Sequence, residues 1–186
     1  MAIAIGGTLT VPSKGHERLT PGVAVALTIR LQIIFCMNIV SLRPIDETNE
    51  EVCATLRVTE EQAGLIAPNA KSLEWAKTNP NCVPLAVYAD DVMVGFVMYE
   101  PRGNGIFSIH RCMIDAKNQR QGFGRRAMEL TIERIRQLGG ITIYLSFRPE
   151  NNAARRLYES LGFVKHEIEP DGEIVYRLGP VHDIAY

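Results

Sequence analysis

The segment Gln119–Gly124 contains residues whose types and spacing could bind a phosphate group. Gly122 and Gly124 leave backbone N–H groups uncovered by a Cβ atom, and a helical pattern begins at the same place. The positive end of the helix dipole therefore points at these groups. Three arginines flank the loop and add mobile cations: Arg120, Arg125 and Arg126. Together these features predict a pyrophosphate site at the start of the helix.

Two common phosphate loops do not fit this segment. A Walker loop ends in Gly-Lys-Ser/Thr and the dinucleotide fingerprint reads G-x-G-x-x-G, whereas residues 119–126 read Gln-Arg-Gln-Gly-Phe-Gly-Arg-Arg. An ordinary glycine-rich turn is the alternative interpretation of the loop taken alone. The elements that position the loop therefore have to decide between the two.

The composition is that of one globular domain without a strong electrostatic preference. The 186 residues are 46% hydrophobic and 22% charged, which is enough to bury a core. The net charge of −1 gives no global attraction to nucleic acid or to an anionic membrane, so we expect neither as a partner. Widely spaced cysteines without a C-x-x-C pair predict reduced thiols in a cytoplasmic protein and no metal site: Cys36, Cys53, Cys82 and Cys112.

Residues 1–36 differ from the rest, and we expect them to be an N-terminal extension outside the domain. Residues 1–19 mix Gly, Thr, Pro and Ser without a helical or strand period. The apolar run that follows is interrupted by Arg30 and Gln32, which makes it a poor membrane span. We therefore expect the domain to occupy residues 37–180, followed by a C-terminal tail at 181–186.

The first third of the domain is predicted to be helical. Capping-type spacings predict helix starts near Thr48 and at Glu60, and Ser72 is a third candidate cap. In the first of these helices, Val52 and Leu56 form the expected apolar stripe.

The rest of the chain predicts strands alternating with two helices, and hence an α/β (α+β) fold with a mixed, mostly antiparallel sheet flanked by helices. Asn104-Gly105 is a strong hairpin turn signal, and Gly95 inside a strand suggests a bulge or a close backbone approach. The predicted strands are Leu85–Ala89, Val92–Tyr99, Ile106–Ile114, Ile141–Phe147, Phe163–Ile168 and Glu173–Leu178.

One βαβ unit places the glycine loop. The strand Ile106–Ile114 leads through the helix Gly124–Leu138 to the strand Ile141–Phe147. This order puts the anion site at the carboxyl end of a strand. Asn151-Asn152 is expected to cap the second helix, which follows the unit.

At this spacing the chain resembles the GNAT superfamily of N-acetyltransferases. The resemblance rests on Gln119-x-x-Gly122-x-Gly124 followed by Asn151-Asn152-x-Ala154-x-x-Leu157-Tyr158-x-x-x-Gly162-Phe163. The segments at 72–76, 94–99 and 144–146 are similar to the bacterial spermine/spermidine (diamine) acetyltransferase branch. The resemblance implies the GNAT fold, with the βαβ unit binding acetyl-CoA as donor.

The resemblance also assigns roles to residues. The pyrophosphate would lie on the amides of the glycine loop, the pantetheine would lie as a pseudo-strand against the preceding strand end, and Asn151 would bind the pantetheine arm. Tyr158 would protonate the leaving thiolate, which suits a phenol with a reference pKa of about 10. The cofactor-binding residues implied in this way are Cys112, Met113, Ile114, Gln119, Arg120, Gln121, Gly122, Phe123, Gly124, Arg125 and Asn151.

Several of these residues also have structural interpretations. Tyr158 shares a helical stripe with Ala154 and could be a core ring, and Arg125 could simply pair with Glu129. Cys112 is more typical of a small buried apolar residue than of a nucleophile. A single strand histidine such as His110 could act as a base, but it is usually structural, so we do not assign it.

The acceptor is predicted from charge. Acidic residues are concentrated in the early helices, and basic residues surround the glycine loop, which suggests two ligands of opposite charge. In the family that the chain resembles, the early helices cover the acceptor side of the cleft, so the resemblance makes Glu60, Glu61 and Glu100 candidates for binding a small cationic amine such as spermidine or spermine. A protein or peptide amine, an aminoglycoside, or a catalytically silent acetyl-CoA-binding module remain alternatives. A homodimer is compatible with the sequence.

Overall fold

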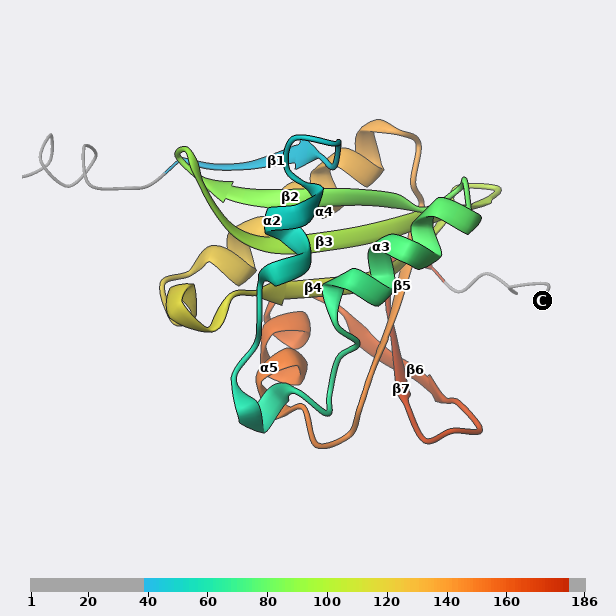
Figure 1. Ribbon diagram of the computed structural model, residues 1–186. Coiled ribbons are helices and arrows are strands. Elements are labelled where there is room, and N and C mark those ends of the chain that lie inside the picture. Colours follow the sequence, from blue (N-terminus) through green and yellow to red (C-terminus); the bar gives the residue numbers. More distant parts are fainter. Residues whose placement is uncertain (1–38, 181–186) are drawn as a thin grey trace, which may run out of the picture. The chain divides into compact units, whose positions relative to one another are not determined.

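The structure, a computed structural model, describes residues 39–180 (Figure 1). The expected extension at 1–36 and tail at 181–186 lie outside the described residues. Within the described part, seven strands form one sheet in the order β1-β2-β3-β4-β5-β7-β6. The strands are β1 (Val40–Pro44), β2 (Val83–Ala89), β3 (Val92–Gly103), β4 (Ile106–Ile114), β5 (Thr142–Phe147), β6 (Val164–Ile168) and β7 (Ile174–Leu178). The helices are α2 (Glu50–Thr55), α3 (Asn69–Thr78), α4 (Phe123–Gln137) and α5 (Asn152–Ser160), with 3₁₀ turns η1 (Glu60–Gln62) and η2 (Ala116–Asn118).

The strand directions confirm the predicted mixed sheet. Strands β1 to β4 pair antiparallel in sequence order, and β5, β7 and β6 also pair antiparallel. The two groups are joined by the parallel pair β4–β5, with α4 as the crossover. The predicted βαβ unit is therefore present.

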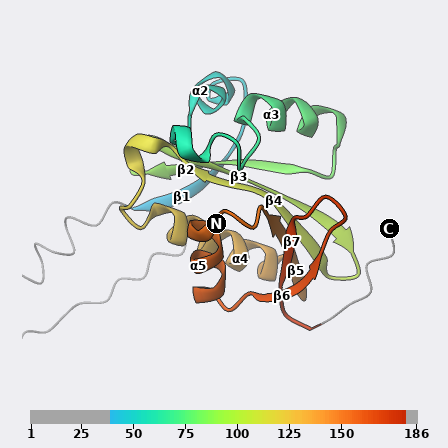
Figure 2. The ribbon, with the colours of Figure 1, turned by 90° about the horizontal axis from the view of Figure 1, so that it is seen from below.

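Helices cover both faces of the sheet (Figure 2). On the face of α2 and α3, buried Phe96, Met98 and Met113 pack with Leu73. On the opposite face lie α4 and α5, where buried Met128 packs with side chains of the central strands. The sheet is thus buried on two sides, as expected where strands are almost continuously apolar.

The central hairpin follows directly from local sequence. Asn104 and Gly105 have φ values of 51° and 74°, which is the left-handed backbone of the predicted turn. Strand β4 has the bounds predicted from the sequence, Ile106–Ile114.

Strands β4 and β5 separate before either of them ends. Their pairing begins at Ile106 with Thr142 and stops at Ile109 with Leu145. At the same place the partners of Met98 and Tyr99 in β3 are Arg111 and Ile109, so His110 is the extra residue of a β-bulge. The edge of β4 beyond Ile109 therefore has no β5 partner, and this opening holds the site.

The early helices agree only in part with their predicted starts. Helix α2 begins at Glu50 with Asn49, not Thr48, at the N-cap, and Val52 is 50% exposed while Cys53 is buried. The helix expected at Glu60 does begin there, with Thr59 at the N-cap, but it is only the 3₁₀ turn η1. Helix α3 begins at Asn69, and Ser72 is a buried residue within it that accepts a hydrogen bond from Arg111. At Ser72 a tertiary contact overrides the capping signal, because its hydroxyl is bound to Arg111 of β4.

Gly95 makes the close approach that the sequence suggested, and this gives a prediction for stability. A Cβ atom added to Gly95 would lie 2.4 Å from the Met113 carbonyl oxygen. We expect Gly95→Ala to lower the free energy of unfolding by about 1–3 kcal/mol, because backbone must move to admit the methyl group. Urea denaturation measures this. The control is Gly64→Ala, where the added Cβ meets no atom within 4 Å, and an equal loss in both variants would contradict the prediction.

Candidate active site

The glycine loop presents free backbone amides at the start of α4. Gly122 stands at the N-cap with φ 85° and has no side chain to occupy the first turn. Arg120 also has a left-handed backbone, with φ 65°, which is strained for a residue with a Cβ and typical of ligand sites. The amides of Phe123, Gly124 and Arg125 lack intrahelical acceptors, so they can bind an anion.

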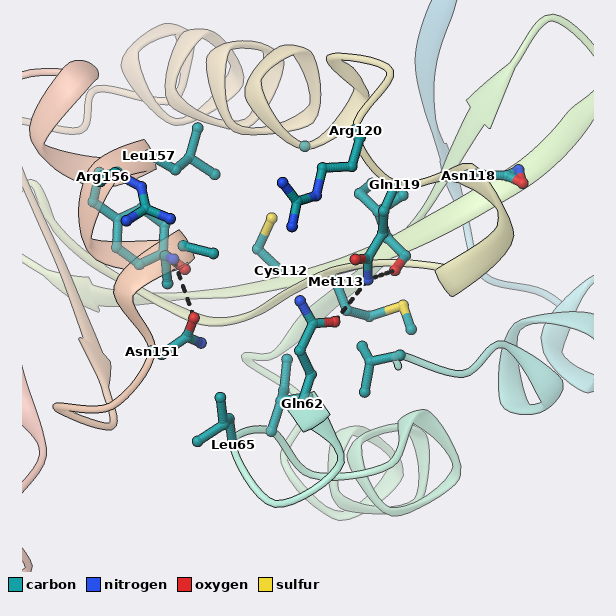
Figure 3. A pocket seen from close by; sticks show the side chains of 17 residues that line it. Gln62, Leu65, Cys112, Met113, Asn118, Gln119, Arg120, Asn151, Arg156 and Leu157 are labelled. Atoms are coloured by element: carbon teal, nitrogen blue, oxygen red, sulfur yellow. Dashed lines mark hydrogen bonds between the residues drawn. The ribbon is translucent and has the colours of Figure 1, made fainter. Parts of the chain in front are cut away.

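Gln119 fixes the loop to its surroundings. Its side-chain Nε2 donates to the Ile114 carbonyl oxygen at 3.0 Å and to Gln62 Oε1 at 2.7 Å. These bonds tie the loop to the end of β4 and to η1 across the opening (Figure 3). Gln119 therefore positions the loop while it also lines the cavity beside it.

A cavity of about 320 Å³ lies between the glycine loop, the end of β4, α5 and the segment 58–66. Figure 3 shows Arg120 from the loop and Arg156 from α5 at its two sides. It brings together the predicted residues Cys112, Met113, Ile114, Gln119, Arg120, Gly124, Asn151 and Tyr158. We refer to it as the donor cavity.

Four residues predicted to bind the cofactor do not line this cavity with their side chains. Phe123 is buried in the core, and Arg125 donates to Ser160 Oγ at 2.6 Å with Glu129 nearby at 3.8 Å. Gln121 and Gly122 form the exposed loop before α4. These four residues could contact an anion through their backbone amides. The Arg125 side chain could also do so, but only after leaving Ser160.

The donor cavity also contains residues that the sequence did not indicate. Gln62, Leu65 and Ile66 come from the irregular segment around η1, and Arg156 comes from α5. Arg156 follows the Asn151 cap by five residues, so the motif could have indicated it. No sequence motif marks the residues around η1, because the path of an irregular loop decides where they lie.

A second cavity, of about 440 Å³, adjoins the first on the side of the loop 63–68, and we refer to it as the acceptor cavity. Its polar lining residues include Lys71, His110, Arg111, Ser146, Arg148 and Glu173. The two cavities share lining residues, which are Leu65, Ile66, Cys112, Asn151, Ala154 and Tyr158. A molecule in one cavity can thus meet a molecule in the other beside Tyr158 and Cys112.

Tyr158 has a core ring and an open hydroxyl. The residue is 8% exposed, and its ring packs edge-on against Phe147 at a centroid distance of 5.5 Å. Within residues 39–180 the hydroxyl has no hydrogen-bond partner, yet it is not among the buried unpaired atoms, so a ligand can reach it. Burial, and secondarily Cys112, raise the pKa of Tyr158, so the phenol stays protonated and can donate.

Cys112 and Asn151 line both cavities, as Tyr158 does. Burial raises the pKa of the Cys112 thiol to about 12, which keeps it protonated and unsuited to nucleophilic attack at neutral pH. Asn151 caps α5 as predicted, because its Oδ1 accepts from the Ala154 amide at 3.1 Å. Its side-chain NH₂ group remains to donate to a ligand in either cavity.

The acids expected to bind the acceptor lie in different places. Glu60 and Glu61 are exposed on η1 and line neither cavity. Glu100 in β3 reaches the acceptor cavity only indirectly, through His110 Nε2 at 2.9 Å. Glu173, which the sequence analysis missed, lines the cavity and accepts from Ser146 Oγ at 2.6 Å.

Cations also line the acceptor cavity. Arg148 lies 3.6 Å from Glu173 and is partly neutralised by it. Arg111 donates to Ser72 Oγ at 2.9 Å and to a backbone carbonyl, and Lys71 is exposed. Neither Arg111 nor Lys71 forms an ion pair with another residue in the part of the chain that the structure describes.

The fold and the site define the class of protein. Free backbone amides at one end of the opened β4–β5 pair, a protonated phenol at its centre and a second cavity beyond it would suit a transferase with a phosphate-bearing donor. Residues 46–163 match the model of the Acetyltransferase (GNAT) family, and the chain belongs to this family. It is an acetyl-CoA-dependent N-acetyltransferase.

Two relatives of this chain have different named acceptors. The spermine/spermidine N(1)-acetyltransferase of Bacillus subtilis is 29% identical over 145 residues, which cover 73% of this chain and 95% of that protein. The [ribosomal protein bS18]-alanine N-acetyltransferase of Salmonella typhimurium is 35% identical over 79 residues, 42% of this chain and 53% of that protein.

Solved structures show the same fold. PaiA N-acetyltransferase from Thermoplasma acidophilum, in complex with coenzyme A, is 12% identical with a TM-score of 0.63, covering 76% of this chain and 99% of that chain. The ribosomal-protein-S18-alanine N-acetyltransferase of Escherichia coli is 21% identical with a TM-score of 0.60, covering 80% and 99%. Among the described helices, none is long and apolar enough to cross a membrane.

Proposed function

We propose that this enzyme transfers the acetyl group of acetyl-CoA to a primary amine of a small cationic acceptor, a polyamine such as spermidine or spermine. The transfer would occur by direct attack in a ternary complex, without a metal ion, in the cytoplasm. The observation that carries the proposal is the meeting of two cavities at the open hydroxyl of Tyr158.

The donor cavity fits acetyl-CoA in its chemistry. The free amides at the start of α4, with Arg120 and Arg156 nearby, suit a pyrophosphate. The edge of β4 beyond Ile109 offers backbone groups that an extended amide chain such as pantetheine can pair with. Asn151 supplies a further donor for that chain.

The same arrangement supports direct transfer. The amine nitrogen would attack the thioester carbonyl carbon, the C–S bond would break, and Tyr158 would give its proton to the departing sulfur. A protonated Cys112 argues against a covalent acetyl-enzyme. The open hydroxyl of Tyr158 is likewise difficult to reconcile with a silent binding module.

Support for a polyamine comes from the Bacillus subtilis relative and from Glu173. The carboxylate of Glu173 lines the acceptor cavity, and those of Glu169 and Asp171 lie within 4.8 Å of it and of each other. A polyamine carries several ammonium groups, so one could bind these acids while another reacts. The roles first expected for Glu60 and Glu61 stay predictions without a cavity contact.

A second acceptor class is favoured by Lys71 and Arg111. Two cations without an ion-pair partner among residues 39–180 suit an acceptor that carries an anionic group beside its amine, such as a peptide. The alanine N-acetyltransferase relatives act on ribosomal protein, which is consistent with this alternative.

One kinetic comparison separates the two acceptors. We expect kcat/KM for spermidine to exceed that for an alanine-terminated peptide and to fall with added salt, because the attraction is electrostatic. Glu173→Gln should raise KM for spermidine about 2- to 5-fold, as for a partly exposed ion pair of up to ~1 kcal/mol.

The matched control is the double variant Glu60→Gln with Glu61→Gln, which alters exposed acids outside both cavities. A larger effect of that pair on KM would restore the assignment made from the sequence. A preference for the peptide, lost in Arg111→Gln, would replace the polyamine by the second acceptor class.

A further inference from the structure

The acceptor cavity is lined by a histidine that is hydrogen-bonded to a carboxylate outside the cavity, and the mechanism above uses neither group. His110 is the bulge residue of β4 and lines the cavity. Its Nε2 lies 2.9 Å from Glu100 Oε2, and the Trp75 ring contacts the imidazole edge-on at a centroid distance of 4.9 Å. The ring is therefore held in one orientation from two sides.

The hydrogen bond fixes which nitrogen carries the proton. Glu100 Oε2 also lies 3.2 Å from Arg102 Nε, and a carboxylate in an ion pair with arginine only accepts hydrogen bonds. Nε2 of His110 must then be the donor, which leaves the lone pair on Nδ1. In the part of the chain described by the structure, Nδ1 has no hydrogen-bond partner, and the buried unpaired atoms are Thr59 Oγ1 and Arg155 Nε, so Nδ1 is open to solvent.

The surroundings keep the imidazole neutral. The pKa of His110 is lowered, first by burial and then by Arg102 and Arg111, although the Glu100 carboxylate opposes this shift. Other titratable groups nearby are Cys82, whose pKa is raised by burial, and those that line the same cavity, which include Lys71, Arg148, Tyr158 and Glu173. A neutral imidazole with a free lone pair can accept a proton at pH 7.

We propose that His110, oriented by Glu100, is the base that removes a proton from the attacking ammonium group of the acceptor. This inference rests on acetyl transfer by the enzyme but not on the acceptor being a polyamine. It assigns to the histidine a role that its position in a strand did not indicate, because the bulge turns it with Arg111 toward the acceptor cavity.

The protons balance as follows. One N–H proton of the ammonium group passes to His110 Nδ1, and the freed lone pair forms the C–N bond with the thioester carbonyl carbon. The C–S bond breaks, the thiolate takes the proton of Tyr158, and the second N–H proton of the former ammonium group returns to the tyrosine through solvent. His110 then releases its proton to water, so one proton leaves per acetyl group transferred.

The test is the pH dependence of kcat/KM, measured with whichever amine the enzyme turns over. The native enzyme should gain activity as His110 loses its proton, with an apparent pKa below the ordinary value of about 6.5, and reach a plateau near neutral pH. His110→Gln should lose about 100-fold at pH 7 and lack this step. Its activity should instead climb with deprotonation of the amine itself, up to about pH 10.

Two further variants separate a base from a structural residue. Glu100→Gln removes a group that raises the pKa of His110, so the acidic limb should move to lower pH. His166→Gln, which changes a half-buried histidine in β6 outside both cavities, should leave the profile unchanged. His110→Ala should regain activity with added imidazole even if its stability falls.

Three outcomes would overturn the proposal. An unchanged acidic limb in His110→Gln would assign the limb to another group, and unaltered activity at pH 7 would make the histidine dispensable. Because Cys82, Glu100 and His110 have potential ligand atoms within 4.8 Å, loss of activity after a chelator, restored by zinc, would make His110 a ligand and not a base. If the enzyme preferred a peptide and still showed the expected pH profile, the role of His110 would be supported and only the polyamine acceptor would be wrong.

Discussion

Replacing Tyr158 by phenylalanine is expected to lower kcat for acetyl transfer by about 100-fold or more while the affinity for acetyl-CoA stays within a factor of about two. The substitution removes a proton donor that acts only when the C–S bond breaks. It keeps the ring that packs against Phe147 and Phe163. Steady-state thiol release and isothermal titration with coenzyme A measure the two quantities.

Tyr176→Phe is the matched control. Its ring belongs to the same core cluster, but its hydroxyl donates to Glu159 Oε1 at 2.8 Å and it lines neither cavity. This variant should lose some stability and keep its turnover. If Tyr158→Phe behaved in the same way, Tyr158 would be only a core residue.

Replacing Gly124 by glutamate is expected to weaken coenzyme A binding by about 100-fold or more while the domain stays folded. A Cβ at this position would lie 3.6 Å from Ile114 Cγ1, which is an ordinary contact, so the backbone need not move. The glutamate side chain would place a carboxylate beside the free amides at the start of α4, where the pyrophosphate is proposed to bind. An acid in the first turn of a helix is otherwise stabilising. Isothermal titration and thermal melting measure the two effects.

Gly124→Ala shows whether charge and length cause the loss. The alanine methyl group fits the available space, so the dissociation constant should change by less than about 5-fold, equivalent to ~1 kcal/mol. Unchanged affinity in Gly124→Glu would move the pyrophosphate away from the start of α4. Equal losses in both variants would indicate that the loop has simply been distorted.

The donor side of the site could be predicted from the sequence because its signals are local. The turn at Asn104-Gly105, the strand Ile106–Ile114 and the glycine loop follow one another along the chain. Asn151 caps its helix three residues before the amide that it binds. Each feature is decided by backbone geometry within a few residues, and short-range propensity describes that well.

The acceptor side could not be predicted in the same way. His110 and Glu100 meet through the register of β3 and β4, and that register depends on a bulge. Glu173 enters the cavity because β7 pairs with β5 ahead of β6. Capping spacings predicted the start of η1 at Glu60 but not that of α3, because Asn69 and Ser72 hydrogen-bond to distant parts of the chain.

The short pairing between β4 and β5 connects ligand binding to the stability of the folded domain. Direct strand pairing between β1–β4 and β5–β7 ends at Leu145, so a ligand that pairs with the free edge of β4 would act as a missing strand between two half-sheets. Binding of this kind stabilises the folded state by mass action, by about 2.7 kcal/mol at a ligand concentration 100 times Kd. The concentration of acetyl-CoA in the cell would then set the rate of the enzyme. It would also set how long each enzyme molecule resists unfolding and proteolysis.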